Sequence, residues 1–218
     1  MPLFSTDKFQ IEIERTCENV YNIYETVIPP DEREVAAMID QIMEYNKKFV
    51  ENKGYEPYLT SKYPNKKLAV LTCMDTRLLE LLPAALGIKN GDAKIIKNAG
   101  GVIVHPYGSV VRSLLVGILE LGVEEVMVIG HTDCGVQGMD GSEMLDMLVE
   151  RGIDQQHIDI VRHSGVDLER WLGGFESVES SVHETVRRLK EHPLMPKDVR
   201  INGFIMDSAT GELRRVEG

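Results

Sequence analysis

The chain has 218 residues, of which 43% are hydrophobic and 27% are charged. These proportions are typical of a globular protein and exclude a fibrous or disordered chain, and the length suits one domain with a single core. The 24 basic and 35 acidic residues give a formal net charge of −11, which argues against nucleic acid or an anionic membrane surface as a partner.

From the sequence we expect no signal peptide and no membrane span. Residues 1–10 are too polar for a signal peptide, and no run approaches the roughly 18 apolar residues of a membrane helix. The three cysteines, Cys17, Cys73 and Cys134, are an odd and sparse set that does not fit a disulfide framework. We therefore expect a cytoplasmic protein whose thiols serve as ligands or nucleophiles.

The first predicted helix runs from Arg33 to Val50. Its apolar residues recur at intervals of three and four, the period of an amphipathic helix, and Pro29-Pro30-Asp31 marks its start. Residues 9–28 mix apolar and charged side chains and fit an additional helix. We assign residues 1–30 to an N-terminal extension or arm of a single domain that spans residues 1–218.

Four short apolar runs have the length and the flanking residues of buried strands, and they cover residues 68–72, 94–97, 125–129 and 201–206. Helix-like stretches at residues 109–121 and 177–191 alternate with them. This alternation predicts the α/β class, with a mostly parallel sheet flanked by helices.

Three motifs follow the first three predicted strands. They are Cys73-Met74-Asp75-Thr76-Arg77, Asn98-Ala99-Gly100-Gly101 and His131-Thr132-Asp133-Cys134-Gly135. In parallel sheets the reactive groups gather outside the carboxyl ends of the strands. The motifs are therefore expected to meet at one edge of the sheet.

The residue types in two of these motifs indicate a metal site. His131 and Cys134 lie three residues apart in one loop, and Cys73 would be the third ligand. Two thiolates and an imidazole favour Zn²⁺, and three protein ligands leave a fourth position open to water, as in catalytic sites. Taken singly, each residue also fits a structural role, because cysteines at strand ends are often small buried hydrophobes.

Asp75 and Arg77 follow Cys73 closely enough to reach the same metal. Two thiolates make zinc a poorer Lewis acid, so an acceptor that orients the bound hydroxide would help catalysis. An aspartate kept ionised by an arginine can be that acceptor, and we assign catalytic roles to Asp75 and Arg77. The alternative is a carboxylate at a helix N-terminus within a surface salt bridge.

Together, the three motifs resemble those of the β-class carbonic anhydrases, and the resemblance covers residues 39–218. It looks closest to the short archaeal and bacterial branch, as residues 193–199 before the last predicted strand also suggest. The resemblance implies the β-carbonic anhydrase fold and a homodimer or higher homo-oligomer. It also implies zinc on Cys73, His131 and Cys134, with Asp75 and Arg77 as the dyad that orients zinc-bound water.

In some members of this family the aspartate moves onto the metal, so Asp75 is a candidate fourth ligand in a closed state. The implied reaction is the reversible hydration of carbon dioxide to bicarbonate and a proton by attack of zinc-bound hydroxide. Backbone N–H groups near Gly100, Gly101 and Gly135 are candidates for the substrate pocket, because a missing side chain allows close approach. Otherwise these glycines only mark helix starts.

Two other functions stay open at this point. Some relatives in the family hydrolyse carbonyl sulfide or carbon disulfide, linear molecules that a similar site can attack. A chain in which Asp75 permanently fills the fourth position would instead be a non-catalytic, zinc-stabilised module.

Overall fold

The computed structural model describes residues 32–217, and the chain divides into two compact units, Met1–Pro57 and Tyr58–Gly218. The main described element of the first unit is helix α2 (Glu32–Glu51), which confirms the helix predicted from Arg33 to Val50. The short 3-10 helix η1 (Glu56–Tyr58) follows it. Residues 1–30, with Cys17, lie outside the described residues, so the N-terminal arm and the single domain stay predictions.

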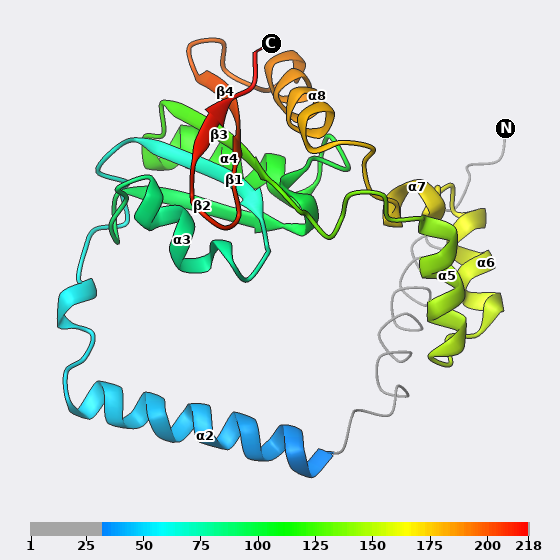
Figure 1. Ribbon diagram of the computed structural model, residues 1–218, viewed down its shortest axis with the longest axis horizontal. Coiled ribbons are helices and arrows are strands. Elements are labelled where there is room, and N and C mark those ends of the chain that lie inside the picture. Colours follow the sequence, from blue (N-terminus) through cyan, green and yellow to red (C-terminus); the bar gives the residue numbers. More distant parts are fainter. Residues whose placement is uncertain (1–31, 218) are drawn as a thin grey trace, which may run out of the picture. The chain divides into compact units, whose positions relative to one another are not determined.

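A five-stranded sheet organises the second unit, with the strand order β2-β1-β3-β4-β5 (Figure 1). The strands are β1 (Leu68–Cys73), β2 (Ala93–Asn98), β3 (Glu125–His131), β4 (Arg200–Met206) and β5 (Leu213–Arg215). The first four are mutually parallel, and β5 pairs antiparallel with β4. The mostly parallel α/β sheet is thus confirmed. Strand β5 was not predicted, since a three-residue strand is too short for a recognisable pattern.

Helices connect the strands. They are α3 (Leu78–Ala85), the 3-10 helix η2 (Ala99–Gly101), α4 (Ser109–Leu121), α5 (Gly141–Glu150), α6 (Gln155–His163), α7 (Leu168–Leu172) and α8 (Val178–Glu191). Helices α4 and α8 confirm the predicted helical stretches, and Ser177 caps α8 by accepting a hydrogen bond from the Ser180 N–H. None of the described helices has the length and apolar character needed to cross a membrane.

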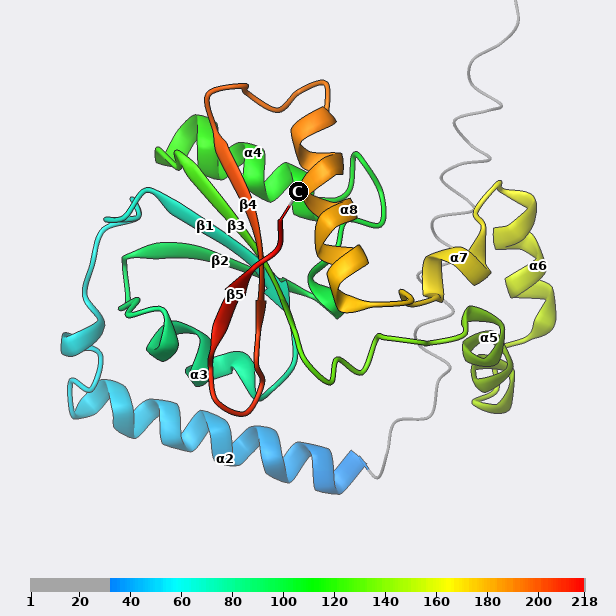
Figure 2. The same cartoon turned by 45° about the horizontal axis from the view of Figure 1, so that its top comes forward.

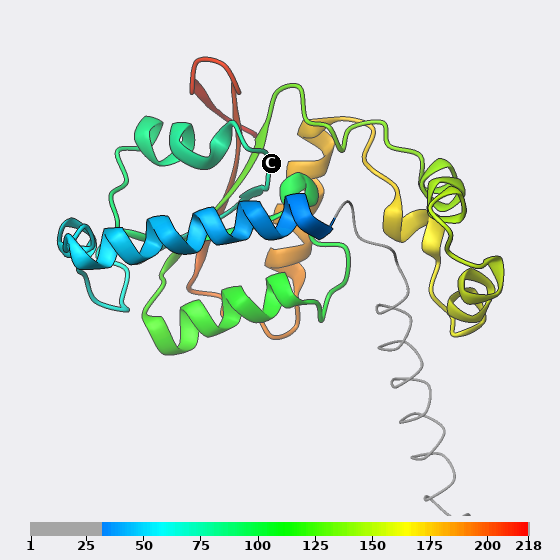
Figure 3. The same cartoon turned by 90° about the horizontal axis from the view of Figure 1, so that it is seen from below.

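The sheet has two buried faces, because successive side chains of a strand point in opposite directions. Leu71 of β1 and Val128 of β3 pack in one cluster with residues of α4 and α8. Val70 and Ile129, one position along, pack in a second cluster with Leu78 and Leu82 of α3. Figure 3 shows α3 and α4 on opposite sides of the strands. Burial on both faces explains why the strands read as continuous apolar runs.

Helices α5, α6 and α7 form a helical insert (residues 141–172) that lies beside the sheet (Figure 2). Its small core contains Leu145, Ile158 and Leu168. The chain segments that enter and leave the insert are joined by backbone hydrogen bonds, from Gly138 N to Phe175 O at 3.0 Å and from Gly174 N to Met139 O at 2.9 Å. The insert is therefore joined to the sheet by a narrow stem, which consists of two paired chain segments, residues 138–139 and 174–175.

Candidate metal centre

The carboxyl ends of β1 and β3 bring three candidate ligands together. These strands are parallel neighbours, with Thr72 opposite Ile129, so their ends lie side by side. The ligand atoms of Cys73, His131 and Cys134 all lie within 4.8 Å of one another, and the three residues are buried. Cys73 and His131 are the last residues of their strands, whereas the sequence placed them just past the strand ends.

The geometry of this cluster fits a zinc ion. The sulfurs of Cys73 and Cys134 are 3.9 Å apart. Two sulfurs at about 2.3 Å from one tetrahedral zinc ion would be separated by roughly 3.8 Å. A pair of sulfurs at this separation, with an imidazole nearby, is a donor set that suits Zn²⁺.

The imidazole of His131 supports the same conclusion. Its Nδ1 lies 2.9 Å from the Thr132 carbonyl oxygen, and because a carbonyl only accepts, Nδ1 carries the proton. Nε2 therefore presents a lone pair, and it is the one buried side-chain nitrogen or oxygen of the described residues that has no hydrogen-bond partner. Such an atom is costly to bury unpaired, and a metal ion would satisfy it.

The protonation of Cys134 links this site to pH. Burial raises the pKa of the Cys134 thiol, while hydrogen bonds from the backbone N–H groups of Val136 and Gln137 act in the opposite direction. A cation next to the sulfur would favour the thiolate and release the proton. On balance the protein disfavours the thiolate, because burial and the neighbouring Cys73 raise the pKa, so a metal would supply the stabilisation of the thiolate.

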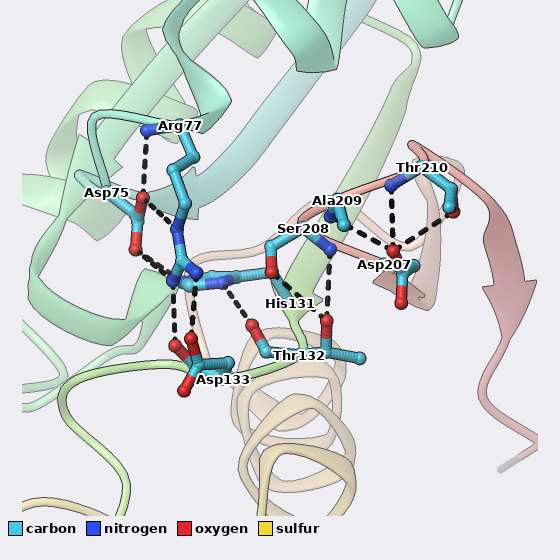
Figure 4. A network of polar contacts seen from close by, with 9 residues as sticks. All are labelled: Asp75, Arg77, His131, Thr132, Asp133, Asp207, Ser208, Ala209 and Thr210. Carbon is cyan, nitrogen blue, oxygen red and sulfur yellow. Dashed lines mark hydrogen bonds and ion pairs between the residues drawn. The ribbon is translucent and has the colours of Figure 1, made fainter.

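Asp75 lies beside the ligand cluster and is held by Arg77 (Figure 4). The Arg77 Nε donates to Asp75 Oδ1 at 3.0 Å, and Nη2 donates to Oδ2 at 2.8 Å. The Arg77 guanidinium lowers the pKa of Asp75 to about 2, so the carboxylate is ionised at neutral pH. Its Oδ2 is 3.9 Å from His131 Nε2. The structure thus places an ionised acceptor next to the candidate ligands.

The structure also brings in Asp133, to which the sequence analysis assigned no role. Its carboxylate and its carbonyl oxygen both accept hydrogen bonds from Arg77, each at 2.8 Å. The signal in the sequence was an acidic residue that lies between two candidate ligands.

The glycine turn after β2 packs against the end of β1. Gly100 and Gly101 have φ values of +82° and +66°, which favour glycine. A Cβ atom on Gly101 would lie 2.9 Å from the Thr72 carbonyl carbon and 3.0 Å from the Cys73 nitrogen. The turn is closed by the Asn98 side chain, which accepts from Val102 N at 3.1 Å and donates to Val102 O at 2.7 Å. Folding alone therefore requires glycine at positions 100 and 101.

Gly135, the third glycine assigned to the substrate pocket, lies on the exposed loop after Cys134. A Cβ atom on it would meet no atom within 4 Å. The contribution of Gly100, Gly101 and Gly135 to a substrate pocket stays a prediction.

The family is shown by comparison with known proteins. A family model described as carbonic anhydrase matches residues 68–213. The Bacillus subtilis protein named "Putative carbonic anhydrase YvdA" is 51% identical over 175 residues, which cover 80% of this chain and 89% of the relative. The chain therefore belongs to the β-class carbonic anhydrase family.

Solved structures and more distant relatives agree with this fold. The crystal structure of β-carbonic anhydrase isoform I from Trichomonas vaginalis is 33% identical, with a TM-score of 0.73, and the match covers 82% of this chain and 96% of that one. A carbon disulfide hydrolase of Acidithiobacillus thiooxidans is 32% identical over 159 residues, which cover 69% of this chain and 77% of the relative. Proteins with two different named activities are thus similar to this chain.

Proposed function

We propose that this protein catalyses the reversible hydration of carbon dioxide to bicarbonate and a proton, with zinc held by Cys73, His131 and Cys134. The observation that carries the proposal is the convergence of these three ligand atoms within 4.8 Å, beside an aspartate that its arginine keeps ionised. Zinc, when bound, supplies a Lewis acid that lowers the pKa of a water molecule toward neutrality.

The side chains around the cluster orient the reactants. Asp75 is ionised and would accept a hydrogen bond from the attacking hydroxide, which forms when the water has lost a proton to solvent, so that a lone pair of the hydroxide points toward the carbon of carbon dioxide. Arg77 binds both carboxylate oxygens of Asp75 and sets their direction. Backbone N–H groups near Gly100, Gly101 and Gly135 would meet the oxygens of the developing bicarbonate.

Elemental analysis and a hydration assay on the same preparation test the proposal. We expect one zinc ion per chain and stopped-flow acceleration of carbon dioxide hydration that rises with pH. A chain that retains the fold but contains no zinc, or that holds zinc and shows no hydration activity at any pH, would contradict the proposal.

Carbon disulfide or carbonyl sulfide is the alternative substrate. The similarity to carbon disulfide hydrolases at 32% identity supports keeping it, whereas the 51% identical relative carries a carbonic anhydrase name. The purified protein should be offered each of the three substrates, with sulfide release as the second readout. Sulfide release without hydration activity would replace carbon dioxide by the sulfur compounds.

A zinc-stabilised module without activity is the remaining alternative. The two hydrogen bonds from the Arg77 side chain to Asp75 favour the enzyme, because they occupy the carboxylate that would otherwise close the metal site. We also propose that the chain forms a homodimer or higher homo-oligomer, which light scattering after gel filtration measures directly.

A further inference from the structure

The guanidinium of Arg77 is shared between two aspartates. Of its five N–H groups, Nε–H and one Nη2–H bind Asp75, at 3.0 and 2.8 Å. The second Nη2–H binds the Asp133 carbonyl oxygen, and Nη1 binds the Asp133 carboxylate, both at 2.8 Å. Asp133 therefore fixes the side of Arg77 that Asp75 leaves free.

The backbone of Asp133 has an unusual conformation. Its φ is +53°, and the other described non-glycine residues with positive φ, Lys53 and Lys67, both precede β1. This conformation costs free energy for most residues, and aspartate is among the few that tolerate it. Asp133 stands between the candidate ligands His131 and Cys134, so the turn that presents these ligands also presents the carbonyl oxygen that binds Arg77.

We propose that Asp133 is a positioning residue that anchors Arg77 and thereby keeps the Asp75 carboxylate out of the cluster formed by Cys73, His131 and Cys134. The inference rests on the proposed metal site. Asp75 Oδ2 is 3.9 Å from His131 Nε2, so the carboxylate is close enough to compete for a metal ion if Arg77 releases it.

Two consequences of removing the Asp133 carboxylate oppose each other. Arg77 would lose the hydrogen bond to the Asp133 carboxylate that fixes its position, which would loosen its contact with Asp75. At the same time, the positive charge of Arg77 would no longer be shared with a second carboxylate, which would strengthen its attraction to Asp75. The two carboxylates use different N–H groups of Arg77, so they do not compete for hydrogen bonds. The Asp133 side chain is 84% exposed, so water screens its charge and this strengthening is weak. Loss of the anchor is therefore the larger consequence.

Azide binding to the cobalt(II)-substituted protein tests this inference, followed by visible absorption. Azide needs a free position on the metal, and an Asp75 that moves onto the metal competes with it. Asp133→Gly keeps the backbone conformation and removes the carboxylate. We expect this variant to bind azide about three- to five-fold more weakly than the wild type. The effect is small because the ion pair between Arg77 and Asp133 is exposed to solvent. Asp133→Asn, which retains an acceptor for Arg77, should stay within about two-fold of the wild type.

A double variant separates positioning from a structural defect. If Asp133 acts through Asp75, then Asp133→Gly should have no effect on azide affinity in the Asp75→Asn background. An Asp133→Gly protein with wild-type azide affinity would overturn the proposal. Equal weakening with and without the Asp75 carboxylate would also overturn it, because the loss would then not pass through Asp75.

A second test uses the wild-type protein, so it can be made even if the Asp133→Gly variant does not fold. A crystal structure of the cobalt-loaded protein should show Arg77 between both aspartates and Asp75 away from the metal. Cobalt bound by Asp75 while the contact between Asp133 and Arg77 persists would contradict the proposal. Neither test depends on carbon dioxide hydration, so an inactive protein would refute the proposed function and leave this inference open to confirmation.

Discussion

The strand-end site and the helical insert (residues 141–172) obey different constraints. At the strand ends, Cys73, His131 and Cys134 are buried, and the imidazole of His131 is fixed by a hydrogen bond. In the insert, three buried residues form the core, while Trp171 is 57% exposed and Ile160 is 52% exposed. We therefore expect the first region to tolerate little change, because its candidate ligands are buried, and the second to tolerate more, because large apolar side chains remain exposed there.

The contrast follows from what covers each region. The strand ends lie at the carboxyl ends of two inner strands of a sheet that is packed on both faces, so a shift of β3 would move His131 and Cys134 together relative to Cys73 on β1. The insert is joined to the sheet by a narrow stem, and its helices pack mainly on one another. We expect changes at the strand ends to affect chemistry and global stability, and changes in the insert to remain local.

The largest effect is expected from Cys134→Ala. Loss of one of three ligands should reduce the zinc content of the purified protein to near zero, and the metal contribution to folding should be lost with it. Elemental analysis and thermal unfolding measure both. Met74→Ala, at an exposed position next to Cys73, is the matched control and should retain zinc. A Cys134→Ala protein with full zinc content would remove Cys134 from the site.

Asp75→Asn should keep the metal and lose activity. The neutral amide cannot replace an ionised acceptor, so we expect kcat to fall by about 10- to 100-fold, the usual size for residues that orient metal ligands. Stopped-flow hydration with zinc analysis of the same sample measures this change. Full activity in this variant would refute the orienting role of Asp75.

A pair of core substitutions compares the two regions directly. Leu114→Ala, at a fully buried position against the sheet, should lower the free energy of unfolding by roughly 3–5 kcal/mol. Leu145→Ala in the insert should cost about 2 kcal/mol, because the small core around it can relax. Urea unfolding measures the first, and hydrogen exchange of α5 measures the second. Equal global destabilisation by both would show that the insert unfolds together with the sheet.

The smallest effect concerns α8, whose Glu184 accepts hydrogen bonds from Arg187 and Arg188. These arginines lower the pKa of Glu184 to about 2. Because the folded pKa lies below the unfolded one, the stabilisation is complete above about pH 4.5 and disappears as the pH falls toward 2. Glu184→Gln should therefore cost at most about 1 kcal/mol at pH 7, since the pair is partly exposed.

The same variant is informative at low pH. Unfolding curves of the wild type and Glu184→Gln should converge between pH 4.5 and 2. A difference that stays constant over this interval would mean that Glu184 contributes through packing and not through its charge.

Most of the sheet could be predicted from local patterns in the sequence. The four parallel strands and helices α4 and α8 were predicted, because long amphipathic periods and continuous apolar runs are local properties of the chain. The insert was not defined, since α7 has only five residues and α6 only nine, which is too short for a recognisable pattern. The ends of the strands were predicted less accurately. Cys73 and His131 were placed just past the strand ends, whereas they are the last residues of β1 and β3.

The sequence by itself determined which residue types were available for metal chemistry and that their motifs follow parallel strands. Only the tertiary structure decided that Cys73 and Cys134 lie 3.9 Å apart and that the Nε2 of His131 is left unpaired. It also decided that Arg77 binds Asp133 as well as Asp75. Contacts between residues 56 positions apart depend on strand order and on the backbone conformation of one turn, and neither is encoded in local periodicity.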